Sequence, residues 1–152
     1  MTDVITKTTH VRAPLDRVWR AISDHHEFGQ WFRVALDQPF EAGTESTGKM
    51  TYPGYEGYPW RAQITAVEPP HRLAYEWVPG SDAANEEFDA GLRTTVEFQL
   101  EEEGDGTRVT ITETGFDKVP EARRESALRD NTGGWNVQAD NLREYAEARA
   151  DA

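Results

Sequence analysis

Two adjacent histidines flanked by acids are the first residues of this chain whose types could do chemistry. His25 and His26 lie between Asp24 and Glu27, and imidazole and carboxylate groups are common zinc ligands. Adjacent residues on a turn or at the start of a helix point in different directions, so two neighbours rarely meet on one ion without a third ligand. We therefore interpret the segment as a solvated turn between two helices and predict no metal site.

Conventional catalytic signatures are missing from the sequence. The chain has no cysteine and no G-x-S-x-G, H-E-x-x-H, Walker or dinucleotide-binding glycine motif. The four serines that could act as nucleophiles have no histidine pattern near them: Ser23, Ser46, Ser81 and Ser126. We predict no catalytic residue and no cofactor from these motifs. A triad assembled from distant residues would escape such a search, so an enzyme stays open as an alternative.

Aromatic residues are the strongest candidates for a binding site. They make up 11% of the chain and include five tryptophans, and aromatic rings shape a cavity wall well. The same rings also fit a simpler role, in which they pack a sheet against a helix. We predict a ligand-binding set of eight residues: Trp31, Phe32, Tyr52, Trp60, Tyr75, Trp77, Phe98 and Trp135.

Polar residues that would orient a ligand among these rings are harder to choose. The candidates by position are Glu76, Arg93, Thr94 and Glu97. Strand alternation puts Glu76 opposite Tyr75 and Trp77, and it puts Glu97 opposite Phe98. If the aromatic face is inward, both of these acids face solvent.

The elements that must position these residues follow from periodicity. Residues 3–12 alternate and are rich in β-branched side chains, which predicts a strand. Pro14 suits the first turn of a helix that carries Leu15, Val18, Trp19 and Ile22 on one face. Asp24 and the two histidines form the expected cap and turn. A short second helix then follows, because Phe28, Trp31 and Phe32 have helical spacing.

From residue 35 to 116 the pattern changes to about six strands. Trp60–Glu68 and Arg72–Val78 alternate, and 92–101 with 106–115 forms the clearest hairpin around E-E-G-D-G. The segment 53–59 is rich in glycine, proline and tyrosine, and it fits either a hairpin connection or the mouth of a pocket. The polar, acidic segment 80–91 is predicted to be a loop.

Helical pattern returns at the end of the chain. Residues 120–130 begin with a proline and form one predicted helix, and Gly133 and Gly134 are expected to interrupt or thin it. A further helix follows from Trp135 to about Ala150, with Ala139 and Leu142 on its apolar face. This order predicts an α+β domain, in which an antiparallel sheet curves around the C-terminal helix.

Five segments together resemble the START-like, helix-grip (SRPBCC) superfamily in its AHSA-type branch, which is named for similarity to the C-terminal domain of the activator of the heat-shock-protein ATPase. They are V-R-A-P-L-D-R-V-W-R-A-I-S-D, Q-W-F, A-V-E-P-P-H-R-L-A-Y-E-W, T-T-V-E-F-Q-L-E-E-E-G-D-G-T-R-V-T-I-T-E-T-G-F and G-W-N-V-Q-A-D-N-L. They occur in family order across residues 1–152, which we treat as one domain. The resemblance implies a cavity between the curved sheet and the long helix.

The resemblance does not fix the function, because one fold hosts many activities. We favour a module that binds a small, mostly apolar or aromatic ligand. One alternative is a polyketide cyclase- or dehydratase-like enzyme of the same fold, and another is a domain that interacts with a chaperone in a stress response. A homodimer also stays open.

Charge restricts the partners further. The chain has 28 acidic and 16 basic side chains, a formal net charge of -12. An acidic surface repels phosphate backbones and anionic lipid heads, so we expect no nucleic-acid partner and no membrane insertion. The absence of cysteine and of a signal-peptide pattern leads us to expect a cytoplasmic protein.

Overall fold

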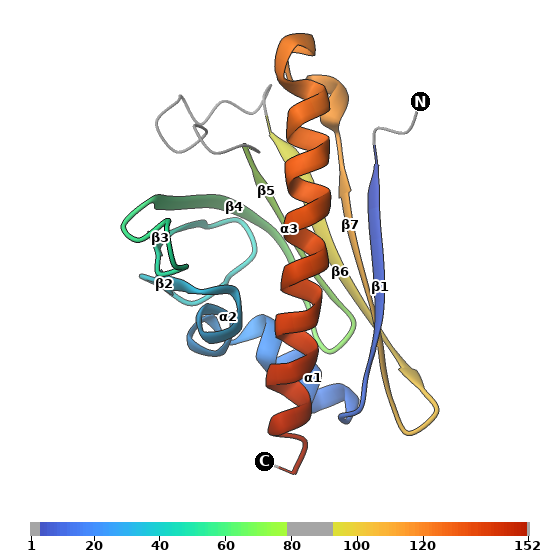
Figure 1. Ribbon diagram of the computed structural model, residues 1–152. Helices are drawn as coiled ribbons and strands as arrows, with labels where there is room; N and C mark the ends of the chain where they lie inside the picture. The colour runs from blue at the N-terminus through green and yellow to red at the C-terminus, as the bar shows by residue number, and fades with distance from the viewer. Residues whose placement is uncertain (1–3, 79–92, 152) are drawn as a thin grey trace.

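The computed structural model describes residues 4–78 and 93–151, and in these residues a seven-stranded antiparallel sheet curves around a long helix (Figure 1). The order across the sheet is β1-β7-β6-β5-β4-β3-β2, so the first strand pairs with the last one. The strands are β1 (Ile5–Val11), β2 (Val34–Leu36), β3 (Glu45–Met50), β4 (Pro59–Glu68), β5 (Arg72–Trp77), β6 (Thr94–Glu103) and β7 (Gly106–Thr114). The predicted loop at 80–91 lies outside the described residues.

The helices are α1 (Leu15–Ser23), α2 (His25–Phe32), the 3₁₀ turn η3 (Phe116–Lys118) and α3 (Glu121–Ala148). Pro14 is the N-cap of α1, one residue before the first turn in which the sequence places it. The Asp24 carboxylate accepts hydrogen bonds from the backbone N–H groups of His26 (2.9 Å) and Glu27 (3.1 Å), which satisfies two of the unpaired donors at the start of α2. The predicted α+β helix-grip fold is confirmed.

Two local predictions are wrong. His25 and His26 are the first residues of α2 rather than a turn, because the cap at Asp24 starts the helix immediately before them. Gly133 and Gly134 do not interrupt the last helix, and α3 is continuous over 28 residues. Each glycine costs a helix only about 1 kcal/mol relative to alanine, and the burial of Trp135, Ala139 and Leu142 against the sheet outweighs that cost.

The concave face of the sheet carries the core. Alternate residues of the central strands point inward, so Trp60, Ala62 and Ile64 of β4 are buried, as are Val96, Phe98 and Leu100 of β6 and Val109 and Ile111 of β7. The register between β4 and β5 shifts between Ile64 and Ala66. Such an irregularity bends a strand and increases its twist, which agrees with the curvature of β4 in Figure 1.

Polar contacts connect α1, α2 and α3 to one another. Gln138 on α3 donates a hydrogen bond to the carbonyl of Phe32 at the end of α2 (2.9 Å). Glu27 on α2 accepts hydrogen bonds from the buried Arg17 of α1 and from the hydroxyl of Tyr145 on α3 (3.0 Å for the latter). These contacts hold α1 and α2 against the C-terminal half of α3.

Candidate functional site

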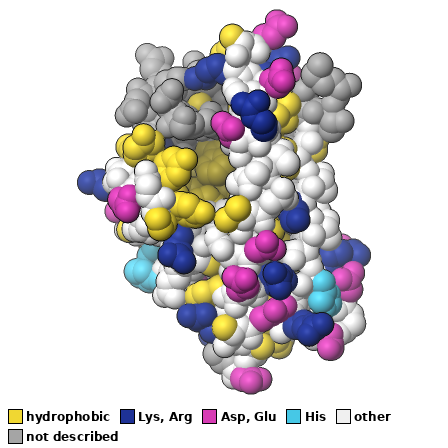
Figure 2. Space-filling model, viewed as in Figure 1, with side chains coloured by type: hydrophobic (Ala, Val, Ile, Leu, Met, Phe, Trp, Pro, Cys, Tyr) yellow, Lys and Arg dark blue, Asp and Glu magenta, His cyan; other side chains and the backbone are white. Residues whose placement is uncertain are grey.

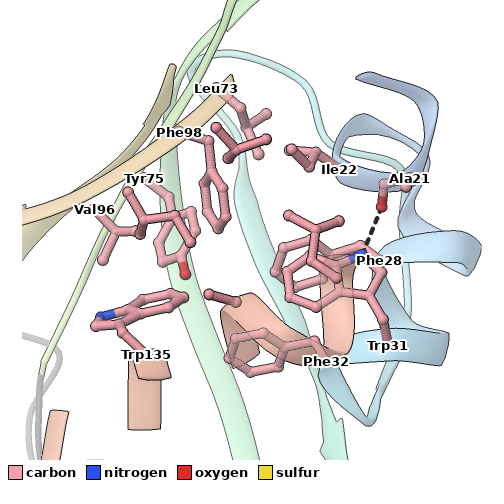
Figure 3. Packing of buried hydrophobic residues seen from close by; sticks show 14 of the residues in the cluster. Ala21, Ile22, Phe28, Trp31, Phe32, Leu73, Tyr75, Val96, Phe98 and Trp135 are labelled. Carbon is pink, nitrogen blue, oxygen red and sulfur yellow. Dashed lines mark hydrogen bonds between the residues drawn. The ribbon is translucent and has the colours of Figure 1, made fainter. Parts of the chain in front are cut away.

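Seven of the eight predicted ligand-binding residues meet between the sheet and α3. Ring centroids within this group are 5.3 to 6.4 Å apart, and most pairs are edge to face or tilted, which are favourable geometries for aromatic rings. We call this group the aromatic cluster; it consists of Trp31, Phe32, Trp60, Tyr75, Trp77, Phe98 and Trp135. The rings that Figure 3 labels from this group point toward one another from α2, β5, β6 and α3.

Tyr52 is the one predicted residue that the structure places elsewhere. Its ring contacts Tyr55 at 6.1 Å, and Tyr55 contacts Tyr58 at 5.8 Å, in the connection between β3 and β4. Tyr55 and Tyr58 are exposed. Among the described residues, no ring contact joins Tyr52 to the aromatic cluster.

Burial differs within the aromatic cluster. Six of its members are buried, and only Trp77 is partly exposed. Trp31 has its indole N–H bonded to the carbonyl of Ala21 on α1 at 2.8 Å, so it also packs α2 against α1 (Figure 3). Trp77 is therefore the member that connects the cluster to the surface.

A buried carboxylate lies behind this cluster. The side chain of Glu113 on β7 has no exposed surface. It accepts hydrogen bonds from the indole N–H groups of Trp77 (2.8 Å) and Trp135 (2.9 Å), and from the hydroxyl of Thr94 (2.5 Å). The side-chain amide of Asn131 donates to both carboxylate oxygens, at 3.0 and 3.1 Å. β5, β6, β7 and α3 thus converge on one acidic group.

These contacts define what Glu113 can do. An ionised carboxylate only accepts hydrogen bonds and offers about four lone-pair positions. Here five donor contacts fall on its two oxygens, and every partner is an N–H or O–H donor. The arrangement therefore suits the charged form and leaves no lone pair directed at a substrate.

Tyr75 adds an unpaired donor to the same region. Its hydroxyl is buried and has no hydrogen-bond partner among the described residues, and in Figure 3 it points toward Trp135. Burial, together with the nearby charge of Glu113, raises the pKa of Tyr75 well above its ordinary value. The phenol therefore stays neutral and able to donate a hydrogen bond.

The four polar candidates from the sequence divide between the two faces of the sheet. Thr94 is buried and donates to Glu113, so it belongs to the site. Glu76 pairs with Arg93 (3.4 Å) and Glu97 pairs with Arg72 (2.6 Å) on the outer face, as alternation predicts. Glu113 and Asn131 are not among the site residues predicted from the sequence. The alternation of Val109 and Ile111 continues to Glu113, and Asn131 lies one helical turn before Trp135. Both patterns therefore predict that these side chains face inward.

The surface beside α3 is hollowed. Figure 2 shows a recess next to the helix, bordered and floored by hydrophobic side chains on the side of β3 and β4. A different depression of about 440 Å³ lies between the start of α1 and the β6–β7 turn, and its lining includes Leu15, Glu102 and Asp105. None of the aromatic cluster lines that second depression.

Residues 4–78 and 93–151 contain neither a metal-binding cluster nor a membrane-spanning helix. No group of three or more histidine, aspartate or glutamate side chains there is arranged to hold a metal ion. None of the helices in the same ranges has the length and apolar content needed to span a membrane.

The family follows from comparison with known proteins. Residues 12–147 match the model of the family described as activator of Hsp90 ATPase homolog 1-like protein, AHSA1. The chain belongs to the AHSA1 family. The match covers α1, α2, all of the strands except β1, and nearly all of α3, so it includes every residue of the aromatic cluster and Glu113. A search of the curated proteins finds no match to this AHSA1-family chain.

Solved structures show the same fold. DynU16, from the dynemicin biosynthetic locus, is 20% identical with a TM-score of 0.73; the match covers 99% of this chain and 49% of DynU16, so this AHSA1-family chain spans about half of that relative. A protein from Arthrobacter aurescens is 19% identical, with a TM-score of 0.77 and coverage of 96% and 87%. The Aha1 dimer from Colwellia psychrerythraea is 14% identical, with a TM-score of 0.72 and 97% of both chains covered. Identities this low support the fold alone.

Proposed function

We propose that this protein binds a small, mostly apolar or aromatic molecule between the sheet and α3, with the aromatic cluster as the wall of the site. The observation that carries the proposal is the Tyr75 hydroxyl, which is buried among these rings without a partner. A buried tyrosine hydroxyl usually finds a hydrogen-bond partner, and leaving one unpaired costs about 1–3 kcal/mol. A ligand with an acceptor group would pair this hydroxyl.

Access to such a site runs past Trp77. It is the partly exposed member of the cluster, and its ring lies 5.9 Å from that of Trp135 on α3. The apolar recess beside α3 in Figure 2 is the surface that a ligand would enter. Pockets for small molecules are mostly apolar, with few polar groups that fix orientation. In this proposal Trp77 moves or packs against the ligand, and Tyr52 with its neighbouring tyrosines borders the entrance.

Binding fits this site better than catalysis does. An enzyme of the same fold would need an activated polar group facing its substrate. Glu113 is the one buried acid among the described residues, and donors already occupy its lone pairs. The relationship of DynU16 to a biosynthetic locus is consistent with a small-molecule ligand for this chain as well.

Native mass spectrometry of the protein purified from cells tests the proposal. We expect the wild-type protein to carry a small-molecule adduct and Trp77→Ala to lose it while keeping its circular dichroism spectrum. Trp19→Ala is the matched control, because Trp19 is also a partly buried tryptophan but lies on α1 outside the aromatic cluster. An adduct of equal occupancy in all three proteins, or a wild-type protein without any adduct, would contradict the proposal.

Assembly is a separate proposal. The Colwellia relative was solved as a dimer, and we propose that this chain also forms a homodimer. Light scattering at several protein concentrations distinguishes a mass of twice 17.2 kDa from that of one chain.

A further inference from the structure

Glu113 is a buried acid without a positively charged partner. Its hydrogen bonds come from two indoles, one hydroxyl and one amide, all of which are neutral. No lysine, arginine or histidine forms an ion pair with it in residues 4–78 and 93–151, and the rest of the sequence contains none of these residue types. By contrast, the partly buried Glu27 is paired with Arg17 and Arg20.

A buried carboxylate with only neutral hydrogen-bond partners keeps an uncompensated negative charge in the protein interior. Hydrogen bonds to a carboxylate offset part of the cost of burying it, at about 1.5–3 kcal/mol each. They do not cancel its charge, and a low-dielectric interior transmits the field of that charge to whatever lies nearby. The aromatic cluster is therefore held in the field of one negative charge.

Two rings of the aromatic cluster are in direct contact with this charged group. Trp77 and Trp135 each donate the indole N–H to Glu113, one to each carboxylate oxygen. The face of an aromatic ring is already the negative part of its quadrupole, and tryptophan binds cations best. A carboxylate at the N–H pushes electron density into the ring, so both faces become more attractive to positive charge. The centroids of these two rings are 5.9 Å apart, with 33° between the planes.

We propose that the ligand carries a positively charged nitrogen, as a protonated or quaternary organic amine on an apolar body, and that this charge lies against the indole faces of Trp77 and Trp135. The inference rests on the proposed function, because it names the class of ligand for the same site. Glu113 supplies the opposite charge from behind the rings, without touching the ligand.

Two further features agree with a cationic ligand. The Tyr75 oxygen keeps lone pairs besides its unpaired O–H, so it can accept from a protonated amine and also donate to an acceptor group on the same ligand. The formal net charge of -12 raises the local concentration of cations around the protein and repels anions.

Three phenols of similar size and different charge test the inference by isothermal titration calorimetry. They are 4-(trimethylammonio)phenol, which is cationic, 4-tert-butylphenol, which is neutral and has the same shape, and 4-hydroxybenzenesulfonate, which is anionic. We expect the cationic phenol to bind about tenfold more tightly than the neutral one, and the anionic one to bind most weakly. A neutral phenol that binds as tightly as the cationic one would overturn the inference and leave the proposed function standing. If none of the three binds, the proposed function fails with it.

Two variants test whether Glu113 causes the preference for the cationic phenol over the neutral one. Glu113→Gln keeps the shape of the side chain and removes its charge, so we expect the ratio of the affinities for the cationic and the neutral phenol to fall from about ten to about one. Glu97→Gln is the control, because it removes one negative charge from the outer face of the sheet, where Glu97 pairs with Arg72. It should keep the tenfold preference, and loss of the preference in this control would overturn the assignment to Glu113.

A second variant keeps the test decisive if Glu113→Gln does not fold. Trp77→Phe retains an aromatic face at the partly exposed position and removes the N–H that donates to Glu113. We expect the preference for the cationic phenol to fall about threefold in this variant. An undiminished preference would overturn the role of the hydrogen-bonded indole.

Discussion

Trp135 on α3 and Glu113 on β7 are joined by a hydrogen bond of 2.9 Å between the indole Nε1 and the carboxylate Oε1. Both side chains are buried. The contact therefore fixes the long helix to the concave face of the sheet by a polar group as well as by ring packing. The same carboxylate reaches Trp77 on β5 and Thr94 on β6, so one acidic side chain sets the spacing of the elements that enclose the site.

Removal of this carboxylate should destabilise the protein strongly. Glu113→Ala leaves the donors of Trp135, Thr94 and Asn131 without their acceptor in the interior, and we expect the free energy of unfolding to fall by about 3 kcal/mol or more. Urea denaturation measures this change. Glu97→Ala is the comparison, because its ion pair with Arg72 is partly exposed and should be worth less than about 1 kcal/mol. Similar losses in the two variants would refute the structural role of Glu113.

Removal of two buried hydroxyls, those of Tyr75 and Thr94, should change the free energy of unfolding in opposite directions. Tyr75→Phe removes a hydroxyl that has no partner, so we expect the free energy of unfolding to stay the same or rise by about 1 kcal/mol. Thr94→Val removes the 2.5 Å hydrogen bond to Glu113 at constant shape, so we expect a loss of about 1.5–3 kcal/mol. Thermal and urea unfolding compare the two. A destabilised Tyr75→Phe protein would show that this hydroxyl has a partner in solution.

Alkaline pH should weaken the fold through Tyr75. Burial, with a further contribution from the charge of Glu113, raises the pKa of this phenol in the folded protein above the value near 10 of an unfolded chain. The contribution to stability is therefore complete below pH 10 and is lost as the pH rises, because only the unfolded state releases the proton. We expect the free energy of unfolding to fall by about 1.4 kcal/mol per pH unit above pH 10.

Tyr75→Phe provides the control for this pH dependence, because phenylalanine has no proton to release. Urea denaturation between pH 9 and pH 11 should give a smaller slope for the variant than for the wild-type protein. Equal slopes in the two proteins would assign the alkaline loss to other groups.

Replacement of two helical glycines by alanine should also change the stability of the protein in opposite directions. A Cβ at Gly29 of α2 would lie 2.2 Å from the carbonyl oxygen of Val34, so Gly29→Ala should cost about 2 kcal/mol or more. A Cβ at Gly133 of α3 meets nothing within 4 Å, so Gly133→Ala should stabilise the protein by about 0.5–1 kcal/mol. Thermal unfolding of both variants checks this. A destabilised Gly133→Ala protein would contradict the continuous α3.

Much of the fold could be predicted because its signals are local. The cap at Asp24, the proline before α1 and the alternation of β6 and β7 depend on residues close in sequence. The predicted break at Gly133 was wrong for the opposite reason, since the packing of Trp135 and Leu142 against a distant sheet keeps α3 continuous. Helix propensity alone does not include that packing.

The candidate site was predictable only for its apolar part. Strand alternation identified Tyr75, Trp77 and Phe98 as one face, and the structure brings their rings together. Glu113 was not predicted because hydrophobic side chains identified the inward-facing strand positions. An acidic residue at such a position is normally expected to face solvent. Its donors come from β5, β6 and α3, and no local pattern connects these elements.

The four polar residues that could orient a ligand, Glu76, Arg93, Thr94 and Glu97, are not separated by the sequence alone into buried and exposed side chains. Only Thr94 of these proved to be buried with Glu113. Tyr52 was chosen by residue type, and its ring contact is with Tyr55 instead of the aromatic cluster. Its predicted role in ligand binding stays a prediction.

The indole resonances of the five tryptophans test the central claim most directly. In a ¹H–¹⁵N spectrum of the whole chain titrated with 4-(trimethylammonio)phenol, we predict that the Nε1–H signals of Trp77 and Trp135 shift most and saturate together. The signal of Trp19 on α1 should stay in place. Unchanged signals for Trp77 and Trp135, or a larger shift at Trp19, would contradict a cationic-ligand site between the sheet and α3.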